Sequence, residues 1–399
     1  MRELANGKPE TRIPKLETRN SKSILIISAF DPLEGEGREL IRYPILAREL
    51  VEQGASVTYI SSSFDHFAKA ERKASVHDLP YQLHFISTPQ YARNIGLKRL
   101  WNHYIFGKKL IAHLEANTTR FDAIISAFPP IGANIRLGKW AKEKGIPFFV
   151  DIQDLWPEAW LSKIPQGIGN GFAKRIITRR KKMIEGADGV IAVSEDYLRR
   201  LGWDQEKGKV FHLGGHFLSE LADSRPRSEI RLILVAGSDH LPFLSTLIAQ
   251  MDELPPQVKL NLVGRSRAIR EISPSDRISV HFDVTKDEKD KLLQQADWGL
   301  VLNDPSLHSR MPNKVFSYLS YGLPIISNLK GGELESLLKQ EAWGAVCETD
   351  LSDFAQIVQG QLAHSAHFDK KNIYTRARSI FDKQFIYKAY AHYILKQLV

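Results

Sequence analysis

The chain has 399 residues, of which 43% are hydrophobic and 25% charged, and its formal net charge is +9. At roughly 100–200 residues per domain, this length predicts two or three globular domains and argues against a disordered chain. A single cysteine, Cys347, excludes an intramolecular disulfide or a cysteine-built zinc site and fits a reducing compartment. Because no apolar run reaches about 18 residues and residues 1–23 lack a secretory core, we expect a cytoplasmic protein.

The positive charge is concentrated in residues 91–200, which contain 19 lysines and arginines against 10 aspartates and glutamates. Two basic clusters, within 93–109 and 174–182, are interleaved with or flanked by apolar side chains. Each predicts either a helix lying on an anionic membrane surface or a solvated helix whose apolar side meets the core. The charge implies an acidic partner, and the absence of a recognised nucleic-acid motif argues against nucleic acid.

Short apolar runs alternate with helical patterns after a polar segment, residues 1–22, that we expect to be a mobile tail. Continuous apolar strands between helices indicate a parallel sheet covered on both faces, and we assign residues 23–218 to this first domain. Its expected strands are 23–30, 56–61, 83–87, 123–128, 147–151, 189–194 and 209–213, with helices at 40–54 and 136–144.

A polar stretch, residues 219–228, interrupts the alternation, which then restarts in a second domain at residues 229–373. Residues 374–399 predict one or two helices that pack back on the first domain. The fold class is therefore α/β, with two Rossmann-like domains facing across a cleft and ligands at the carboxyl ends of the strands. The expected strands of this domain are 231–236, 258–263, 278–282, 298–303, 324–327 and 345–347.

Residues 310–326, RMPNKVFSYLSYGLPII, predict a helix that starts at Pro312, where the missing N–H of proline is tolerated. The free backbone N–H groups at the start of a helix attract anions. Asn313 and Lys314 both lie in this first turn, and Lys314 adds a full positive charge. Ser317 lies one turn further on the same face, and Met311 precedes the helix. The arrangement suits a diphosphate with a sugar hydroxyl near Ser317, or an ordinary strand–helix turn with a surface lysine.

A second motif, residues 150–160 with the sequence VDIQDLWPEAW, follows an expected strand and contains Asp151, Asp154 and Glu158. A carboxylate at this edge can take the proton of an attacking hydroxyl. The alternative is that the acids cap the start of a helix. We rank Asp154 first and Asp151 second as the catalytic carboxylate, acting as general base in an inverting reaction or positioning the acceptor in a retaining one.

Three loops after strands offer backbone or cationic contacts to a phosphate. In residues 31–38, DPLEGEGR, Gly35 and Gly37 allow close approach of the backbone, and Arg38 follows. The third glycine of a dinucleotide-binding loop is missing, which disfavours an NAD enzyme. We expect no cofactor. The second domain places candidate donor contacts in the loops that follow two of its strands: Gly237, Ser238 and Arg265. We find no Asp-x-Asp metal motif and expect metal-independent chemistry.

The segment 310–326 resembles the donor-site helix of GT-B glycosyltransferases, in particular glycosyltransferase family 4. The family pattern is Pro-x-Lys, a Glu three residues on, then Tyr-Leu-x-x-Gly-x-Pro-Val-Ile, and it matches here at Pro312, Lys314, Tyr318, Leu319, Gly322 and Pro324. Ser317 replaces the family glutamate. The string DLWPE at 154–158 is similar to an element of family enzymes of envelope polysaccharide synthesis. The resemblance implies a nucleotide-sugar donor, for which we expect a UDP-sugar, with Lys314 on its phosphates.

The leading hypothesis is a glycosyltransferase that moves a sugar to a lipid-linked saccharide in cell-envelope polysaccharide synthesis. It would act peripherally at the inner face of the membrane, with the basic first domain holding the acceptor. Three alternatives stay open: an inverting glucuronosyltransferase-like enzyme, a nucleotide-sugar epimerase, and a non-catalytic membrane-associated partner with the same fold.

Overall fold

A computed structural model describes residues 21–73, 78–94, 96–156, 170–203, 208–217, 221, 228–237, 241–304, 311–363 and 368–398. Most of the expected tail and of the polar stretch 219–228 lies outside these residues, as do Glu158 and Ser238. None of the described helices combines the length and apolarity that crossing a membrane requires.

The N-terminal half is built on a seven-stranded, wholly parallel sheet with the order β5-β2-β1-β6-β7-β8-β9. A short antiparallel pair, β3 and β4, follows β2 at the edge of the domain that also carries β5. The strands are β1 (Ser23–Ile27), β2 (Ser56–Ser62), β3 (Phe64–Asp65), β4 (Ala70–Glu71), β5 (Gln82–Ile86), β6 (Ala123–Phe128), β7 (Phe148–Ile152), β8 (Gly189–Ala192) and β9 (Gly208–Val210).

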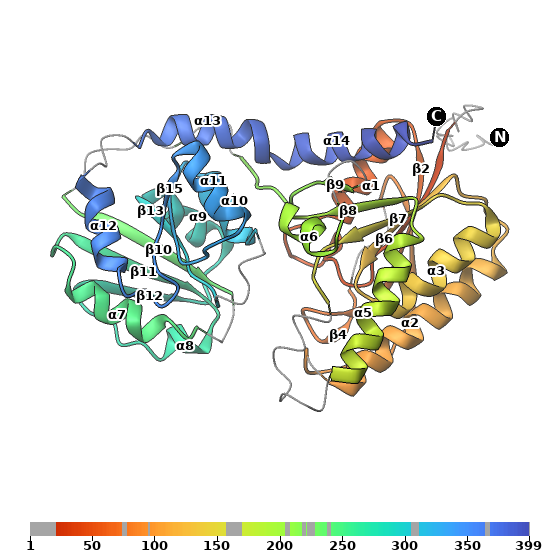
Figure 1. Ribbon diagram of the computed structural model, residues 1–399, viewed down its shortest axis with the longest axis horizontal. Coiled ribbons are helices and arrows are strands. Elements are labelled where there is room, and N and C mark those ends of the chain that lie inside the picture. Colours follow the sequence, from red (N-terminus) through yellow and green to blue (C-terminus); the bar gives the residue numbers. More distant parts are fainter. Residues whose placement is uncertain are drawn as a thin grey trace, which may run out of the picture.

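The C-terminal half repeats the design with a six-stranded parallel sheet of order β12-β11-β10-β13-β14-β15. Figure 1 shows the two sheets in separate units, which confirms the predicted α/β class. The strands are β10 (Ile230–Ala236), β11 (Val258–Gly264), β12 (Ile278–Phe282), β13 (Trp298–Val301), β14 (Ile325–Ser327) and β15 (Gly344–Val346).

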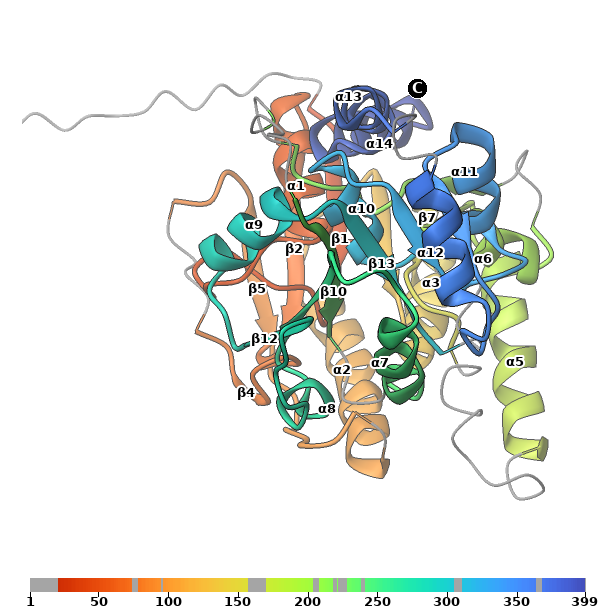
Figure 2. The ribbon, with the colours of Figure 1, turned by 90° about the vertical axis from the view of Figure 1, so that its left-hand side faces the viewer.

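Helices cover both faces of the N-terminal sheet because its central strands are apolar on both sides. Phe106, Leu137 and Ile184 bring three helices onto one face, and Leu46 and Tyr390 bring two others onto the opposite face. Figures 1 and 2 show α2 and α5 extending away from α13 and α14. The helices are α1 (Tyr43–Glu52), α2 (Leu97–Ala116), α3 (Ile131–Lys144), α5 (Asn170–Glu185), α6 (Glu195–Arg200) and α14 (Lys383–Lys396).

The C-terminal sheet is sandwiched in the same way. Leu247, Ile269 and Val358 pack from α7, α8 and α12 on one face, and the other face receives residues of α9, α10, α11 and α13. These helices are α7 (Leu244–Asp252), α8 (Arg267–Arg270), α9 (Lys286–Gln295), α10 (Asn313–Leu319), α11 (Glu333–Glu341), α12 (Phe354–Ala363) and α13 (Lys370–Phe381).

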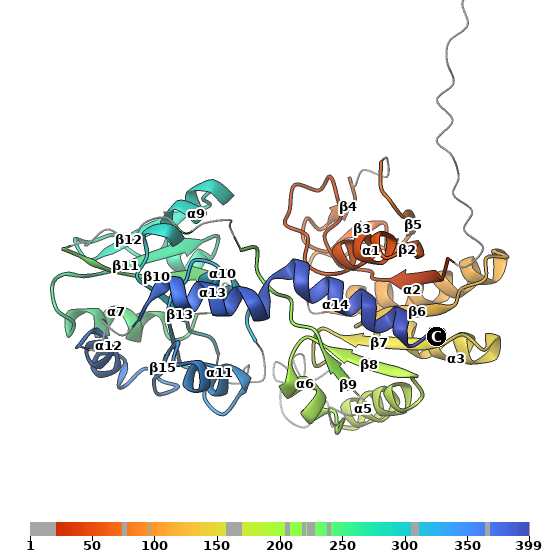
Figure 3. The same cartoon turned by 90° about the horizontal axis from the view of Figure 1, so that it is seen from above.

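Two chain segments cross between the domains and bond to each other. The Gly215 N–H donates to the carbonyl of Phe381 at 2.9 Å, and the Lys383 N–H donates to the carbonyl of Gly215 at 3.1 Å. A side chain at Gly215 would lie 2.8 Å from the Phe316 carbonyl, so the crossing needs glycine. Figure 3 shows α13 over the C-terminal sheet and α14 over the N-terminal sheet, on either side of this crossing.

A fully buried ion pair anchors α14 to the N-terminal domain. Arg42 donates to both oxygens of Asp151, at 2.7 and 2.9 Å, and to the Phe211 carbonyl at 2.6 Å. The Tyr390 hydroxyl donates to the same Asp151 carboxylate at 2.9 Å. Neither Arg42 nor Asp151 is exposed to solvent. This placement corrects the second-ranked catalytic candidate, because a carboxylate sealed under α14 is not accessible to an acceptor hydroxyl.

The domains also meet where α6 and α11 start. The Glu333 carboxylate of α11 accepts from the Ser194 hydroxyl at 2.6 Å and from the Glu195 N–H at 2.9 Å. Asp196 of α6 accepts in return from the Glu333 N–H at 2.8 Å. His212 lies 2.6 Å from the second oxygen of Glu333. Each helix therefore supplies a carboxylate that satisfies a free N–H of the other.

Asp151→Ala is expected to lower the free energy of unfolding by about 3–5 kcal/mol, because it leaves the Arg42 charge buried without a counter-charge. Tyr390→Phe removes only one hydrogen bond to the same carboxylate and should lower it by about 1–2 kcal/mol. Urea denaturation followed by circular dichroism measures both. Equal losses in the two variants would show that the ion pair does not carry the stability assigned to it.

Candidate functional site

A cavity of about 280 Å³ lies between the two domains. The N-terminal domain contributes Arg38 and Phe67, and α10 of the C-terminal domain contributes Asn313 and Ser317. The crossing segment, residues 213–216, lines it as well. Three residues chosen from the sequence, from positions far apart in the chain, thus come together: Arg38, Asn313 and Ser317.

Lys314 belongs to α10, next to Asn313, but it is not among the described residues that line this cavity. Pro312 has extended backbone angles and precedes the helix, which runs for seven residues. The Lys314 amine points to the end of β13, where it donates to the Leu302 carbonyl at 3.4 Å. Burial lowers the pKa of this amine to about 8. Within the described residues it has no carboxylate partner, so a cationic amine is held in a partly buried position without a counter-charge. Because α10 is short, we assign the anion site to this amine and not to the helix end.

The other predicted donor contacts are spread around the edge of the C-terminal sheet. Gly237 is exposed just beyond β10, and Arg265 is paired with Asp283 at 2.5 Å, its side chain 80% exposed. Met311 is buried in the core that packs α10 against the sheet, so its side chain does not face a ligand. Ser238 lies outside the described residues.

The glycine loop after β1 is shaped by a buried carboxylate between the two glycines. Gly35 and Gly37 have φ values of +83° and +67°, which require glycine's backbone freedom. Between them, Glu36 accepts from Arg72 at 2.7 Å, and both side chains are 2% exposed. Arg38 is held by Asp65 at 2.6 Å, with its guanidinium over the Phe67 ring. The loop therefore presents a fixed cation to the cavity.

Asp154 differs from Asp151 although both belong to one motif. It lies in the turn after β7, where its carbonyl accepts from the Trp156 N–H at 3.0 Å, and it is half-buried. The Trp156 carbonyl accepts from Arg180 of α5 at 3.0 Å, which ties this turn to the second basic cluster. Between the two aspartates, the geometry leaves Asp154 as the candidate that a substrate can reach.

Several residues of the site gave no sequence signal. Phe67 and Lys383 line the cavity, and Lys383 is paired with Glu39 at 2.6 Å. Asp31, four residues beyond β1, accepts from the Tyr43 N–H at 3.1 Å and has its pKa raised to about 6 by burial. Its neighbour Pro32 lines the cavity, and Asp31 itself is not among the lining residues. Among the described residues, no cluster of His, Cys, Asp and Glu is arranged to hold a metal ion.

Residues 45–214 match the family model for Glycosyltransferase Family 4. No curated protein sequence is significantly similar to the chain. Among solved structures, Anabaena HepE (Alr3699) in complex with UDP-glucose is 15% identical, with a TM-score of 0.60 over 94% of this chain and 99% of that one.

Two further structures have the same architecture. The lipopolysaccharide outer core galactosyltransferase WaaB in its apo form is 14% identical, with a TM-score of 0.62 over 94% and 99% of the two chains. The catalytic domain of starch synthase IV from Arabidopsis thaliana, bound to ADP and acarbose, is 11% identical, with a TM-score of 0.65 over 95% and 99%.

The fold is that of the GT-B glycosyltransferases, with two parallel α/β units. The chain is a glycosyltransferase that carries a Glycosyltransferase Family 4 domain over residues 45–214, which confirms the predicted class of enzyme.

Proposed function

We propose that the enzyme transfers a sugar from a UDP-sugar to a lipid-linked saccharide at the cytoplasmic face of the cell membrane, in envelope polysaccharide synthesis. The main support for a nucleotide-sugar donor is Lys314. Its amine is partly buried and has no carboxylate partner among the described residues. Neighbouring residues of the same helix line the interdomain cavity. The structural neighbours support the donor class, since HepE is described in complex with UDP-glucose.

In this proposal the Lys314 amine binds the diphosphate and offsets the charge of the leaving group without a metal ion. Ser317, Asn313, Gly237 and Arg265 of the C-terminal domain surround the rest of the donor, and the loop with Gly35, Gly37 and Arg38 faces it from the other domain. Asp154 accepts the proton of the acceptor hydroxyl or positions that hydroxyl.

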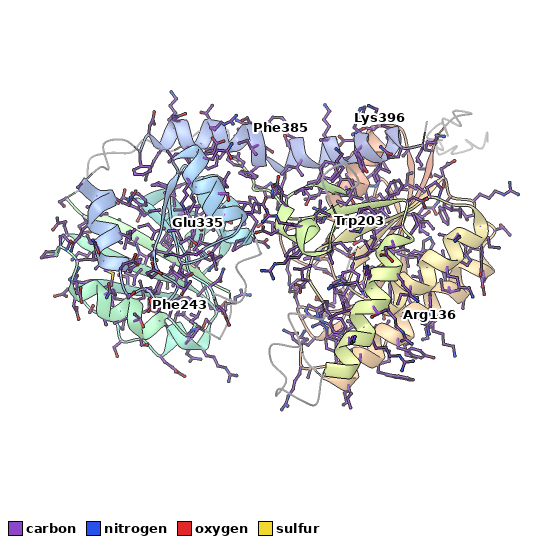
Figure 4. All side chains as sticks on the ribbon, in the orientation of Figure 1. Arg136, Trp203, Phe243, Glu335, Phe385 and Lys396 are labelled. Atoms are coloured by element: carbon purple, nitrogen blue, oxygen red, sulfur yellow. The ribbon has the colours of Figure 1, made fainter. Side chains whose placement is uncertain are left out.

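The proposal of a lipid-linked acceptor at the membrane rests on the layer of helices formed by α2, α3 and α5. Leu97, Trp101 and Tyr104 lie on one face of α2 and are 83%, 54% and 43% exposed. The Trp101 and Tyr104 rings stack at 5.4 Å. Figure 4 labels Arg136 of α3, whose guanidinium lies 5.1 Å from the centre of the Tyr104 ring. Exposed aromatic side chains beside cations are typical of a protein surface that lies on an anionic membrane.

The second basic cluster contributes to the same layer, because α3 contacts both α2 and α5. Lys174, Arg175, Arg179, Lys181 and Lys182 are exposed, whereas Arg180 is buried and supports the Trp156 carbonyl. In this proposal the exposed cations of α5 attract anionic lipid headgroups at long range. The exposed apolar side chains of α2 insert into the membrane surface.

UDP affinity is expected to fall as the pH rises through about 8, because the charged form of Lys314 that attracts the diphosphate is lost there. Lys314→Arg should bind UDP with little change between about pH 7 and pH 10, since a guanidinium stays charged throughout. Lys314→Ala should bind weakly at every pH. Calorimetric titration measures all three, and identical pH profiles for the wild type and Lys314→Arg would contradict the donor assignment.

Asp154→Asn is expected to lower the transfer rate by about 100-fold or more, the range typical of a lost general base. UDP affinity should stay at its wild-type value. The measurement is UDP release from a UDP-sugar with a membrane extract as the source of acceptor. Wild-type turnover by Asp154→Asn would remove this residue from the mechanism.

Binding to mixed phosphatidylcholine–phosphatidylglycerol vesicles is expected to weaken by about tenfold or more in Leu97→Ala/Trp101→Ala, which removes two large apolar groups. The control is Phe385→Ala, because Phe385 is 52% exposed on α14, away from α2 and α3 (Figure 4). Vesicle co-sedimentation compares them. An equal loss in both variants would speak against α2 as the membrane-facing helix.

A further inference from the structure

The N-terminal domain contains a second cavity, of about 610 Å³, at the start of α2. Its walls are Lys69 from the turn between β3 and β4, Tyr91, and the first residues of α2. Neither the glycine loop nor α10 contributes to it, so it is distinct from the interdomain cavity.

Two cations of this cavity are held in place by neutral groups. The Lys69 amine donates to the Asn94 side-chain oxygen at 2.5 Å and lies 5.0 Å from the centre of the Tyr91 ring. Arg99 donates to the Asn94 backbone carbonyl at 2.6 Å. The nine described residues that line the cavity include four cations and no aspartate or glutamate. The positive charge of the cavity is therefore oriented but not neutralised.

Two histidines, His66 and His103, lie close to these cations. Burial lowers the pKa of His66 to about 3, with a further contribution from Lys69 and Arg99. Burial likewise lowers the pKa of His103 to about 3, again assisted by Arg99. The nearby Asp65 carboxylate is paired with Arg38. With these pKa values both imidazoles are neutral at neutral pH, so Lys69 and Arg99 are the charged groups that face an anion here.

The cavity adjoins both the proposed reaction site and the proposed membrane face. Phe67, two residues before Lys69, lines the interdomain cavity. Arg99 contacts His103, whose ring lies 6.2 Å from that of Trp156, in the turn that carries Asp154. On the other side, Leu97 lines the cavity and is 83% exposed, and Trp101 follows one helical turn later.

We infer that this cavity binds a phosphate or diphosphate group of the acceptor, with Lys69 and Arg99 as its principal ligands. The inference rests on the proposed function, since it assigns one part of the lipid-linked acceptor to these residues. A phosphate here lies between the interdomain cavity, where the saccharide reacts, and the apolar face of α2, where the lipid enters the membrane. Arginine and lysine without acidic partners are the groups that recognise phosphate oxygens through charge-assisted hydrogen bonds.

The test is calorimetric titration of the full chain with inorganic pyrophosphate while saturating UDP occupies the donor site. Lys69→Asn/Arg99→Gln should bind pyrophosphate roughly tenfold more weakly or worse, having lost two charge-assisted contacts. Asparagine suits position 69 because its φ is +56°, a region that asparagine tolerates. Lys139→Gln/Lys142→Gln on α3 removes the same charge outside the cavity and should bind as the wild type does. Should the double variant fail to fold, Lys69→Asn alone carries the test.

Unchanged pyrophosphate affinity in the cavity variant, or an equal loss in the α3 control, would overturn the inference. Loss of binding to phosphatidylglycerol-containing vesicles with unchanged pyrophosphate affinity would also overturn it, because the cations would then act on lipid headgroups. Stabilisation by UDP is read separately in the same variants. If UDP stabilised none of them, the proposed function would fail while pyrophosphate binding in the cavity would still stand.

Discussion

The buried ion pair between Arg42 and Asp151 fixes how the two domains are joined. It connects the start of α1 to β7 and, through Tyr390, to the C-terminal helix α14. Since α13 packs in the C-terminal core and α14 follows it directly, holding α14 also holds the C-terminal domain near the N-terminal sheet. Replacement of a pair like this by apolar residues is often harmless, whereas loss of one partner is not. The pair thus acts as a geometric constraint on the interdomain cavity.

That constraint is complemented on the far side of the cavity by the contacts between α6 and α11. Glu333 and Asp196 each satisfy a backbone N–H of the opposite helix, so both carboxylates lose partners if the domains separate. Burial alone would raise the pKa of Glu333, but hydrogen bonds from His212 and Ser194 keep it below its ordinary value. The domains therefore meet through polar groups that water can replace, and such interfaces permit relative motion more readily than apolar ones do. Closure around a donor is compatible with this arrangement.

The order of strands and helices could be predicted because buried parallel strands are continuous apolar runs, as at Ala123–Phe128, where the prediction and the strand coincide. The class of enzyme followed from residues 310–326, although the family model matches the other half of the chain. The two aspartates of 150–160 show where such reasoning ends. They are three residues apart, yet Asp151 is fully buried against an arginine 109 positions away, whereas Asp154 is only half-buried. Met311 illustrates the same limit, because its side chain lies in the core and a position beside a motif does not reveal which side of the backbone faces the core.

The net charge of +9 has a physical consequence for the N-terminal domain. Burial lowers the pKa of the Lys69 amine, and the nearby charge of Arg99 lowers it further, against an opposite effect of Asp65. An arrangement that only stabilised the fold would place an acid between them, as Asp65 is placed beside Arg38 and Glu36 beside Arg72. No acid is among the described residues that line the cavity. An anion bound there, as we propose, would offset the repulsion between these cations. Local destabilisation of this kind is characteristic of binding sites, where the ligand supplies the missing charge.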